Sequence, residues 1–329
     1  MALAWAGRTD VGRVRSQNQD RFRVDADRGI FILADGMGGA AAGDVAAQTV
    51  VDMLPQYMER YLGNLPTADF VQDLPSRLKS AIADLSLQIR KVSSRSVRQA
   101  GMGTTLVVVV AGETEVMVGH VGDSRAYLFR GGRLHQVTSD HTLAQALIDS
   151  GDLTVEEASS QSGLQQLTRY VGMEEPPVVD VSCIQLFEND RLLMCSDGLT
   201  SMVSDADVSR ILSRFAHPDE ACVALVDAAN AAGGRDNTTV VVLQCESHVA
   251  DEQPAHVEQP AYSGPPRPSE EFGGDDRTTV DLSLKDWERA GTVRLPASQF
   301  PAPRSRFAVV QRLREWANPR RHRNEEEES

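Results

Sequence analysis

The chain has 329 residues, of which 41% are hydrophobic and 24% charged, and its formal net charge is −14. This length and apolar content suffice for one large hydrophobic core or two small ones. The acidic balance argues against a nucleic-acid-binding surface, and no apolar run approaches the ~20 residues of a membrane span. We therefore expect a globular protein with no nucleic-acid partner and no membrane span.

The cysteines and the amino terminus bear on the compartment in which the protein works. Cys183, Cys195, Cys222 and Cys245 form no Cys-x-x-Cys pair, and the first residues lack the charged and apolar regions of a signal peptide. Disulfides are rare in cytosolic proteins. We expect reduced core thiols and a cytoplasmic location.

Apolar periodicity and turn residues place the expected secondary structure before residue 245. Short strands follow one another at hairpin spacing over residues 104–138, and Gly131-Gly132 is typical of a two-residue hairpin turn. Links this short require antiparallel pairing, because a parallel crossover needs a dozen or more residues. Strands are expected at residues 30–34, 104–111, 116–121, 125–129, 133–138, 178–184, 191–195 and 238–243, and helices at 43–61, 70–92, 143–149, 155–159, 206–214 and 219–231.

Composition divides the chain into three parts. Residues 1–245 carry antiparallel strands with helices before, between and after them, which predicts one α+β layered domain. Residues 246–303 are rich in Pro, Glu, Asp, Ser and Gly, which is typical of a disordered linker. Residues 304–329 predict a basic amphipathic helix with an acidic end, suited to partner docking or self-contact. Candidate phosphorylation sites are Thr278, Thr279 and Thr292, although an unmodified linker is the favoured interpretation.

An apolar run at residues 30–34 ends in Asp35, which opens a glycine-rich turn beginning at Gly36. Glycine lets the backbone bend and approach a ligand closely. The turn also matches the G-x-G-x-x-A dinucleotide fingerprint, but Asp35 would then face a pyrophosphate, and the acidic residue expected about 20 residues later is missing. A capping Asp in a structural turn is the simplest alternative. We favour a site for a cation.

Four further aspartates occur in the same setting, beside glycines or at the edges of apolar strands: Asp20, Asp123, Asp197 and Asp236. Any one of them alone is most simply a turn residue. If they converge, they cannot all ionise without compensating cations. All-oxygen ligation favours Mg²⁺ or Mn²⁺, and the histidines and cysteines are too scattered along the chain to predict a zinc site.

Short motifs follow one another over residues 5–245. They are Thr9-Asp10-Val11-Gly12, Arg15 to Asp20, Ala34 to Gly39 with Ala42-Gly43, Gly101 to Leu106, Gly119 to Tyr127, Ser196 to Leu199, and Gly234 to Thr239. In this order they resemble the motifs of the PPM (type 2C) family of metal-dependent protein Ser/Thr phosphatases, in its bacterial branch. This resemblance implies two packed antiparallel β-sheets flanked by helices on both sides.

The resemblance also implies the roles of the carboxylates. Asp35 would bridge two Mg²⁺ or Mn²⁺ ions, with the Gly36 carbonyl on one of them, and Asp197 and Asp236 would complete the other. Two such ions lower the pKa of a shared water and orient its in-line attack on phosphorus.

The remaining implied roles belong to residues around this pair. Asp20 would act through water, Asp123 would help hold a third ion, and Arg15 would bind the substrate phosphate. Met37 stands where eukaryotic members carry a proton-donating His, and Gln19 stands where many relatives have Glu. The expected flap over residues 149–166 has Gln161-Ser162 in place of a common His-Pro step.

We therefore expect hydrolysis of phosphoserine and phosphothreonine on proteins, opposing a bacterial Ser/Thr kinase. The alternative is a pseudophosphatase that binds phosphoproteins as a scaffold, although such proteins usually lose one of the carboxylates present here. A two-metal nuclease or phosphodiesterase would need a basic groove, which the motif-bearing part lacks. A cysteine phosphatase is excluded because no Cys has an Arg six positions later.

Overall fold

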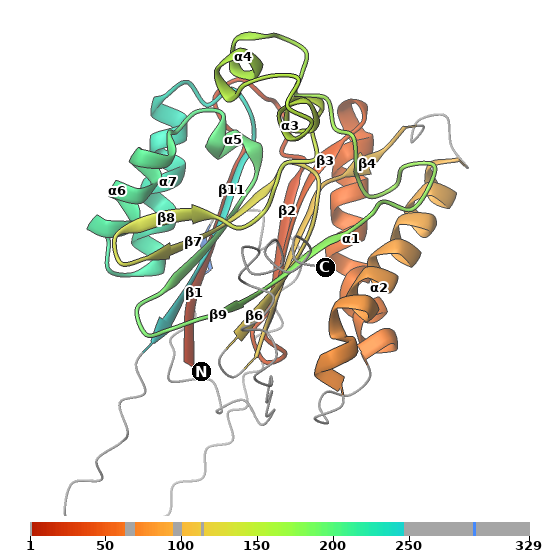
Figure 1. Cartoon of the computed structure of the whole chain (residues 1–329), viewed down its shortest axis with the longest axis horizontal. Coiled ribbons are helices and arrows are strands. Elements are labelled where there is room, and N and C mark those ends of the chain that lie inside the picture. Colours follow the sequence, from red (N-terminus) through yellow and green to blue (C-terminus); the bar gives the residue numbers. More distant parts are fainter. Residues whose placement is uncertain (1, 63–69, 95–100, 113–114, 247–291, 294–329) are drawn as a thin grey trace, which may run out of the picture.

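A computed structural model describes residues 2–62, 70–94, 101–112, 115–246 and 292–293 (Figure 1). Two antiparallel β-sheets pack face to face, and helices cover the outer face of each. This arrangement confirms the predicted α+β fold class. The helices α3 (Leu143–Asp149) and α4 (Val155–Ser160) lie over one end of the sandwich, at the top of Figure 1.

All strands within each sheet pair antiparallel with their neighbours. The first sheet has the order β12 (Thr292–Val293), β1 (Ala2–Asp10), β11 (Thr238–Glu246), β10 (Arg191–Cys195), β7 (Arg125–Arg130) and β8 (Arg133–Gln136). The second sheet has the order β2 (Asp20–Asp25), β3 (Ile30–Met37), β5 (Leu106–Ala111), β6 (Glu115–Val121) and β9 (Asp180–Gln185), with β4 (Gly103–Thr104) paired to the end of β3.

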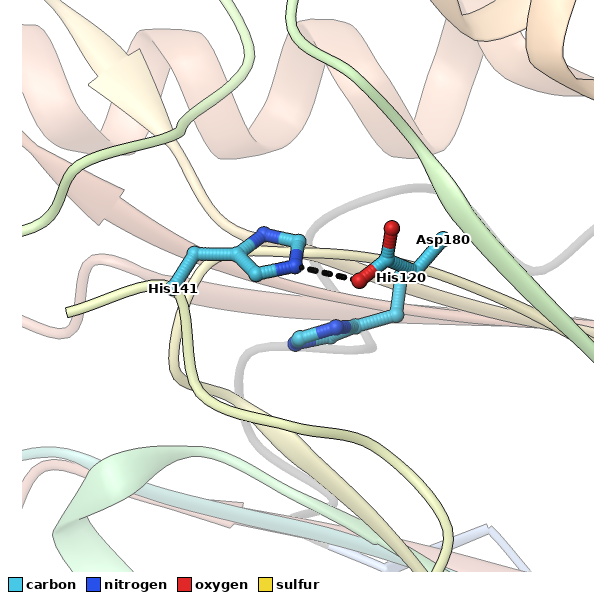
Figure 2. Close-up of side chains that lie close together, drawn as sticks. All are labelled: His120, His141 and Asp180. Carbon is cyan, nitrogen blue, oxygen red and sulfur yellow. Dashed lines mark hydrogen bonds and ion pairs between the residues drawn. The ribbon is translucent and has the colours of Figure 1, made fainter. Parts of the chain in front are cut away.

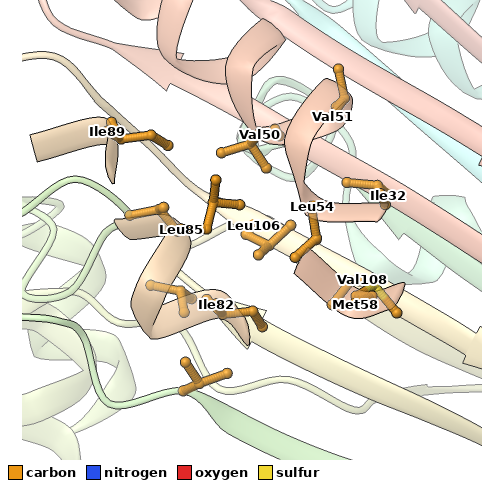
Figure 3. Close-up of a cluster of buried hydrophobic side chains, with 14 of the residues drawn as sticks. Ile32, Val50, Val51, Leu54, Met58, Ile82, Leu85, Ile89, Leu106 and Val108 are labelled. Atoms are coloured by element: carbon orange, nitrogen blue, oxygen red, sulfur yellow. The ribbon is translucent and has the colours of Figure 1, made fainter. Parts of the chain in front are cut away.

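Two long helices, α1 (Gly39–Leu62) and α2 (Phe70–Ser93), cover the second sheet, and Figure 3 shows their apolar side chains against it. On the other side of the sandwich, α6 (Asp205–Arg214) and α7 (Pro218–Ala231) cover the first sheet. The short α5 (Asp197–Thr200) follows β10 directly.

Central strands of this sandwich, such as β3, β5 and β10, are apolar on both faces, because one face meets helices and the other meets the opposite sheet. In β3, Ile30 and Ile32 pack against α1 and α2, whereas Phe31 and Leu33 lie in the layer between the sheets. Side chains alternate between the faces of a strand. Burial on both faces therefore explains the continuous apolar run in the sequence.

The glycine hairpin is confirmed, but one predicted strand pairing is wrong. Gly131 and Gly132 have φ values of 56° and 77°, and Arg130 pairs with Arg133 across the turn. The strands β6 and β7 were expected to pair because their link is short, yet they belong to different sheets. Gly122, at φ 113°, lets the backbone turn from one sheet to the other, which places Asp123 at the crossing.

The structure also contains strands that the sequence did not indicate, namely β1 and β2. Most of the linker, including Thr278 and Thr279, and the expected amphipathic segment lie outside the described residues. Within the expected linker, Thr292 and Val293 form β12, which pairs with Arg8 and Gly7 of β1.

Among the described residues, no helix is long and apolar enough to cross a membrane. All four cysteines are free thiols. Three of them are buried as expected, but Cys183 is exposed on β9, so the expectation of a core position is wrong for this residue.

The layer between the sheets predicts a large stability cost for cavity formation. Leu243 is fully buried there, so Leu243→Ala is expected to lower the free energy of unfolding by roughly 2–5 kcal/mol. The matched control is Val178→Ala at a 68% exposed position, expected within about 0.5 kcal/mol of wild type. Denaturant unfolding measures both, and equal effects would contradict the packing described here.

Candidate active site

Four of the predicted aspartates line one cavity of about 540 Å³ at the end of the sandwich: Asp35, Asp123, Asp197 and Asp236. They come from segments far apart in sequence, so the predicted convergence is confirmed. Among the described residues that line the cavity, none is a Cys, His, Lys or Tyr, and the one cationic side chain is Arg15. The cavity therefore offers oxygen ligands and a single guanidinium.

The antiparallel topology explains why these segments meet. Strand β10 ends just before Asp197, and the neighbouring β11 begins just after Asp236. Their turns touch at Gly198, where an ideal Cβ would lie 1.9 Å from the carbonyl oxygen of Asn237. A side chain at position 198 would push the two carboxylate-bearing turns apart, so glycine is required there.

Hydrogen bonds to its backbone hold Asp35 in place. Its N–H donates to Thr105 Oγ1 (3.0 Å), and its carbonyl accepts from Thr104 Oγ1 (2.8 Å) and from the Thr105 N–H (2.9 Å). The following Gly36 approaches the first turns of α1 so closely that an ideal Cβ would lie 2.0 Å from the Gly43 carbonyl oxygen. Asp35 was expected at the end of its strand, but β3 continues through it to Met37.

Asp20 lies behind the cavity wall, opposite Asp35 in the β2–β3 ladder, and is 1% exposed. Its Oδ2 accepts a hydrogen bond from Ser196 Oγ (2.7 Å). Its Oδ1 is buried and has no hydrogen-bond partner among the described residues. Burial raises the pKa of Asp20 to about 6, although the hydrogen bond from Ser196 acts to lower it. An unpaired buried carboxylate oxygen is costly unless a donor or cation meets it.

Burial and like charge raise the pKa values of the cavity carboxyls. Burial raises the pKa of Asp123 to about 7, with Asp197 adding to it. The pKa of Asp35 is raised well above its ordinary value by burial, then by Asp20 and Asp197. Burial and then Asp236 raise the pKa of Asp197. Divalent cations would relieve this crowding, so the residues present fit a site for Mg²⁺ or Mn²⁺.

Arg15 stands at the mouth of the cavity, where its Nη2 donates to Asp236 Oδ2 over 2.6 Å. The hydrogen bond and the charge of Asp236 raise the pKa of Arg15. The Arg15 side chain is 53% exposed, so its guanidinium can leave Asp236 at little packing cost. The structure brings Arg15 to the predicted place but pairs it with a carboxylate.

The sequence did not identify the residues that brace these aspartates. Asn237 Nδ2 donates to the carbonyls of Val11 and Gln17, and its Oδ1 accepts from the Gln19 N–H. It thereby ties the segment that carries Arg15 to the turn that carries Asp236. Ser196 braces Asp20, because its Oγ donates a hydrogen bond to Asp20 Oδ2. The sequence signal that could have identified Asn237 and Ser196 is their position, because each lies directly beside a motif aspartate.

The expected flap reaches the cavity through Leu167, one residue beyond its predicted end, which lines the wall. Within it, Thr154 and Glu157 form a capping box at the start of α4, with side-chain to backbone bonds in both directions. Met37 also lines the wall, and its thioether can donate no proton.

The comparisons with known proteins agree with this geometry. The family model described as "Protein phosphatase 2C" matches residues 12–229. The chain is 34% identical over 240 residues to the serine/threonine phosphatase stp of Listeria welshimeri, covering 72% of this chain and 94% of that protein.

Solved structures of similar proteins share the fold. Stp1 from Staphylococcus aureus superposes with a TM-score of 0.69 at 30% identity, covering 75% of this chain and 96% of that one. The catalytic domain of the phosphatase PstP, in complex with two manganese ions, superposes with a TM-score of 0.62 at 32% identity, covering 74% of this chain and 99% of that one.

The raised pKa of Asp123 predicts how the metal-free protein responds to pH. An aspartate whose pKa is raised by folding lowers the stability of the folded protein once the pH exceeds the pKa that the residue has in the unfolded chain. For Asp123 this loss of stability is complete above its folded-state pKa of about 7. At pH 8 without metal, Asp123→Asn is therefore expected to be the more stable protein by at least roughly 1 kcal/mol. At pH 4 the difference should largely vanish.

Thermal and denaturant unfolding in EDTA at the two pH values measures this effect. The matched control is Asp227→Asn on the exposed face of α7, which is expected to show no such pH-dependent gain. A wild-type protein more stable than Asp123→Asn at pH 8 would contradict the electrostatic description of the cavity.

Proposed function

Because the chain belongs to the protein phosphatase 2C family of serine/threonine phosphatases, we propose that its carboxylate cavity is the catalytic centre and holds two Mg²⁺ or Mn²⁺ ions. Asp35 and the Gly36 carbonyl would hold one ion, and Asp35, Asp197 and Asp236 the other. The observation that carries this proposal is the convergence of four carboxylates from distant segments on one cavity.

Two further aspartates complete the proposed set. Asp20, with a buried oxygen lacking a partner among the described residues, would act on the ions from behind through water. Asp123 would contribute to a third ion at the side of the cavity. The PstP structure with two manganese ions supports the count of two in the main site.

When bound, the ions would supply positive charge that neutralises the carboxylates and Lewis acidity that lowers the pKa of water for in-line attack on phosphorus. The chain supplies the geometry. Arg15 is placed to release Asp236 and bind the substrate phosphate instead. The two parallel N–H donors of a guanidinium match two phosphate oxygens. With Asp236 holding a cation, its negative charge would be compensated there, and Arg15 would be available to bind the substrate.

Within the part of the chain that the structure describes, the cavity wall contains no cysteine to act as a thiolate nucleophile and no histidine to protonate the leaving group. Met37 occupies the wall without a transferable proton. We propose that the leaving alkoxide takes its proton from solvent water within the site. A pseudophosphatase is disfavoured because every carboxylate of the proposed set is present. A nuclease is disfavoured because the wall carries a single cationic side chain.

The physiological substrates are proposed to be proteins phosphorylated on serine or threonine, including a Ser/Thr kinase that the phosphatase opposes. Relatives named serine/threonine phosphatases support the substrate class. We also propose a cytoplasmic location, which the free thiols of the four cysteines support. Substrate trapping with an Asp197→Asn variant in the native host, followed by cell fractionation, addresses both points.

Loss of the bridging carboxylate is expected to abolish turnover. Asp35→Asn should lower kcat on a phosphothreonine peptide and on p-nitrophenyl phosphate with Mn²⁺ by roughly 10³-fold or more, the scale of losing an essential catalytic group. EDTA should do the same to wild type. Asp227→Asn serves as the matched control and should retain activity. Wild-type rates in Asp35→Asn, with circular dichroism showing both proteins folded, would refute the assignment.

The proposed role of Arg15 predicts that removing its guanidinium lowers the catalytic efficiency toward phosphate-bearing substrates. Arg15→Ala should lower kcat/KM by roughly 10- to 100-fold, the equivalent of about 1.5–3 kcal/mol for a hydrogen bond to a charged group. Arg13→Ala is the control, because Arg13 is exposed nearby and does not line the cavity. Equal losses in both variants would show that general surface charge, rather than a placed guanidinium, attracts the substrate.

A further inference from the structure

Three side chains that do not line the cavity come from distant segments and meet in one cluster. His120 on β6 and Asp180 on β9 face each other in the strand ladder, and His141 joins them from the loop before α3 (Figure 2). The two imidazole rings lie 4.5 Å apart between centroids, and one candidate ligand atom from each residue lies within 4.8 Å of the others. The composition of this cluster would suit a transition metal.

The hydrogen bonds of His141 point to a different role. Its Nδ1 accepts from the Gly122 N–H over 3.1 Å. Its Nε2 lies 2.9 Å from Asp180 Oδ2 and 3.1 Å from Arg169 Nη1. A neutral imidazole carries one proton. Because Nδ1 is an acceptor, the proton resides on Nε2 and is donated to Asp180. Burial lowers the pKa of His141, which favours the neutral ring.

This tautomer leaves His141 without a free lone pair for a metal. The Nδ1 lone pair accepts from Gly122, and Nε2 carries the proton. In addition, Arg169 Nη1 lies 3.3 Å from Asp180 Oδ1 and 3.1 Å from His141 Nε2, so a positive charge already lies beside both groups that a metal ion would approach. A metal would have to displace all of these contacts. The arrangement is better described as a chain of hydrogen bonds from Asp180 through His141 to the backbone.

That chain ends on the turn that carries Asp123. His141 contacts Gly122 twice, because its own N–H also donates to the Gly122 carbonyl over 2.8 Å. The neighbouring Asp140 binds Arg125 through two hydrogen bonds of 2.8 and 2.7 Å. Residues 140–141 therefore contact the backbone or side chain on both sides of Asp123, at the crossing between the two sheets.

We propose that His141 is a positioning residue for Asp123, and that Asp180 sets the tautomer that lets His141 accept from Gly122. The assignment rests on the proposed catalytic role of the cavity. A separate hydrogen bond links His141 to the segment that follows the expected flap, since the His141 carbonyl accepts from the Thr168 N–H over 2.8 Å, next to the cavity residue Leu167.

Two substitutions at position 141 separate the two hydrogen bonds. In His141→Asn the amide oxygen falls near the Nδ1 position and can still accept from Gly122. In His141→Gln the amide nitrogen falls near the Nε2 position and can still donate to Asp180, but Gly122 loses its acceptor. His135→Gln, at an exposed position on β8, is the matched control and should leave activity unchanged.

We expect His141→Gln to raise the Mn²⁺ concentration for half-maximal activity, or to lower kcat, by roughly 10- to 100-fold, the usual scale for residues that orient metal ligands. His141→Asn should retain much more activity than His141→Gln. Equal losses in the two variants, or a larger loss in His141→Asn, would overturn the proposal.

A second measurement does not depend on enzyme activity. It tests the hydrogen bond from the Gly122 N–H to His141 even if the cavity proves inactive. NMR of the imidazole nitrogens in the wild-type protein should show the proton of His141 on Nε2. The Gly122 amide should be protected from hydrogen exchange in wild type and in His141→Asn, but not in His141→Gln. A proton on Nδ1, or a His141 signal that shifts on addition of Zn²⁺ alone, would overturn the proposal.

Discussion

Mutual repulsion among carboxylates at one end of a β-sandwich is the constraint on which the rest of this structure depends. Antiparallel pairing makes strand ends and strand starts coincide, so Asp197 and Asp236 meet at the β10–β11 edge while Asp20 faces Asp35 in the opposite sheet. Burial then raises the pKa values of these acids. The sheets and the helices behind them supply the packing energy that holds the acids together, and divalent cations are the natural complement to such a cluster.

The sequence predicted the part of the site that local pattern encodes. An apolar strand that ends near Asp-Gly, as in the segments of Asp35 and Asp197, indicates where the carboxylate lies along its strand. Like charges set on strand ends then imply a shared cation. The longer helices α1, α2, α6 and α7 were predicted because their apolar faces repeat over several turns, which is the strongest signal a single sequence carries. The four-residue α5 was not predicted, because it is too short to show such a repeat.

Other features depend on contacts that local pattern does not encode. The strand β1 has a weak signal because much of it is alanine and glycine, which rank low in strand preference. The β6–β7 link has a length compatible with a hairpin, yet Gly122 and its contacts with His141 direct the chain into the other sheet. Ser196 reaches Asp20 across 176 positions in sequence, so no local pattern could reveal that pair.

Anomalous diffraction at the manganese absorption edge, on crystals grown with Mn²⁺, tests the central claim most directly. The account predicts strong peaks within the cavity, one of them in contact with Asp35, Asp197 and Asp236 together, and no ordered manganese at His120 and His141. A cavity without a peak, or manganese bound only elsewhere on the protein, would contradict it.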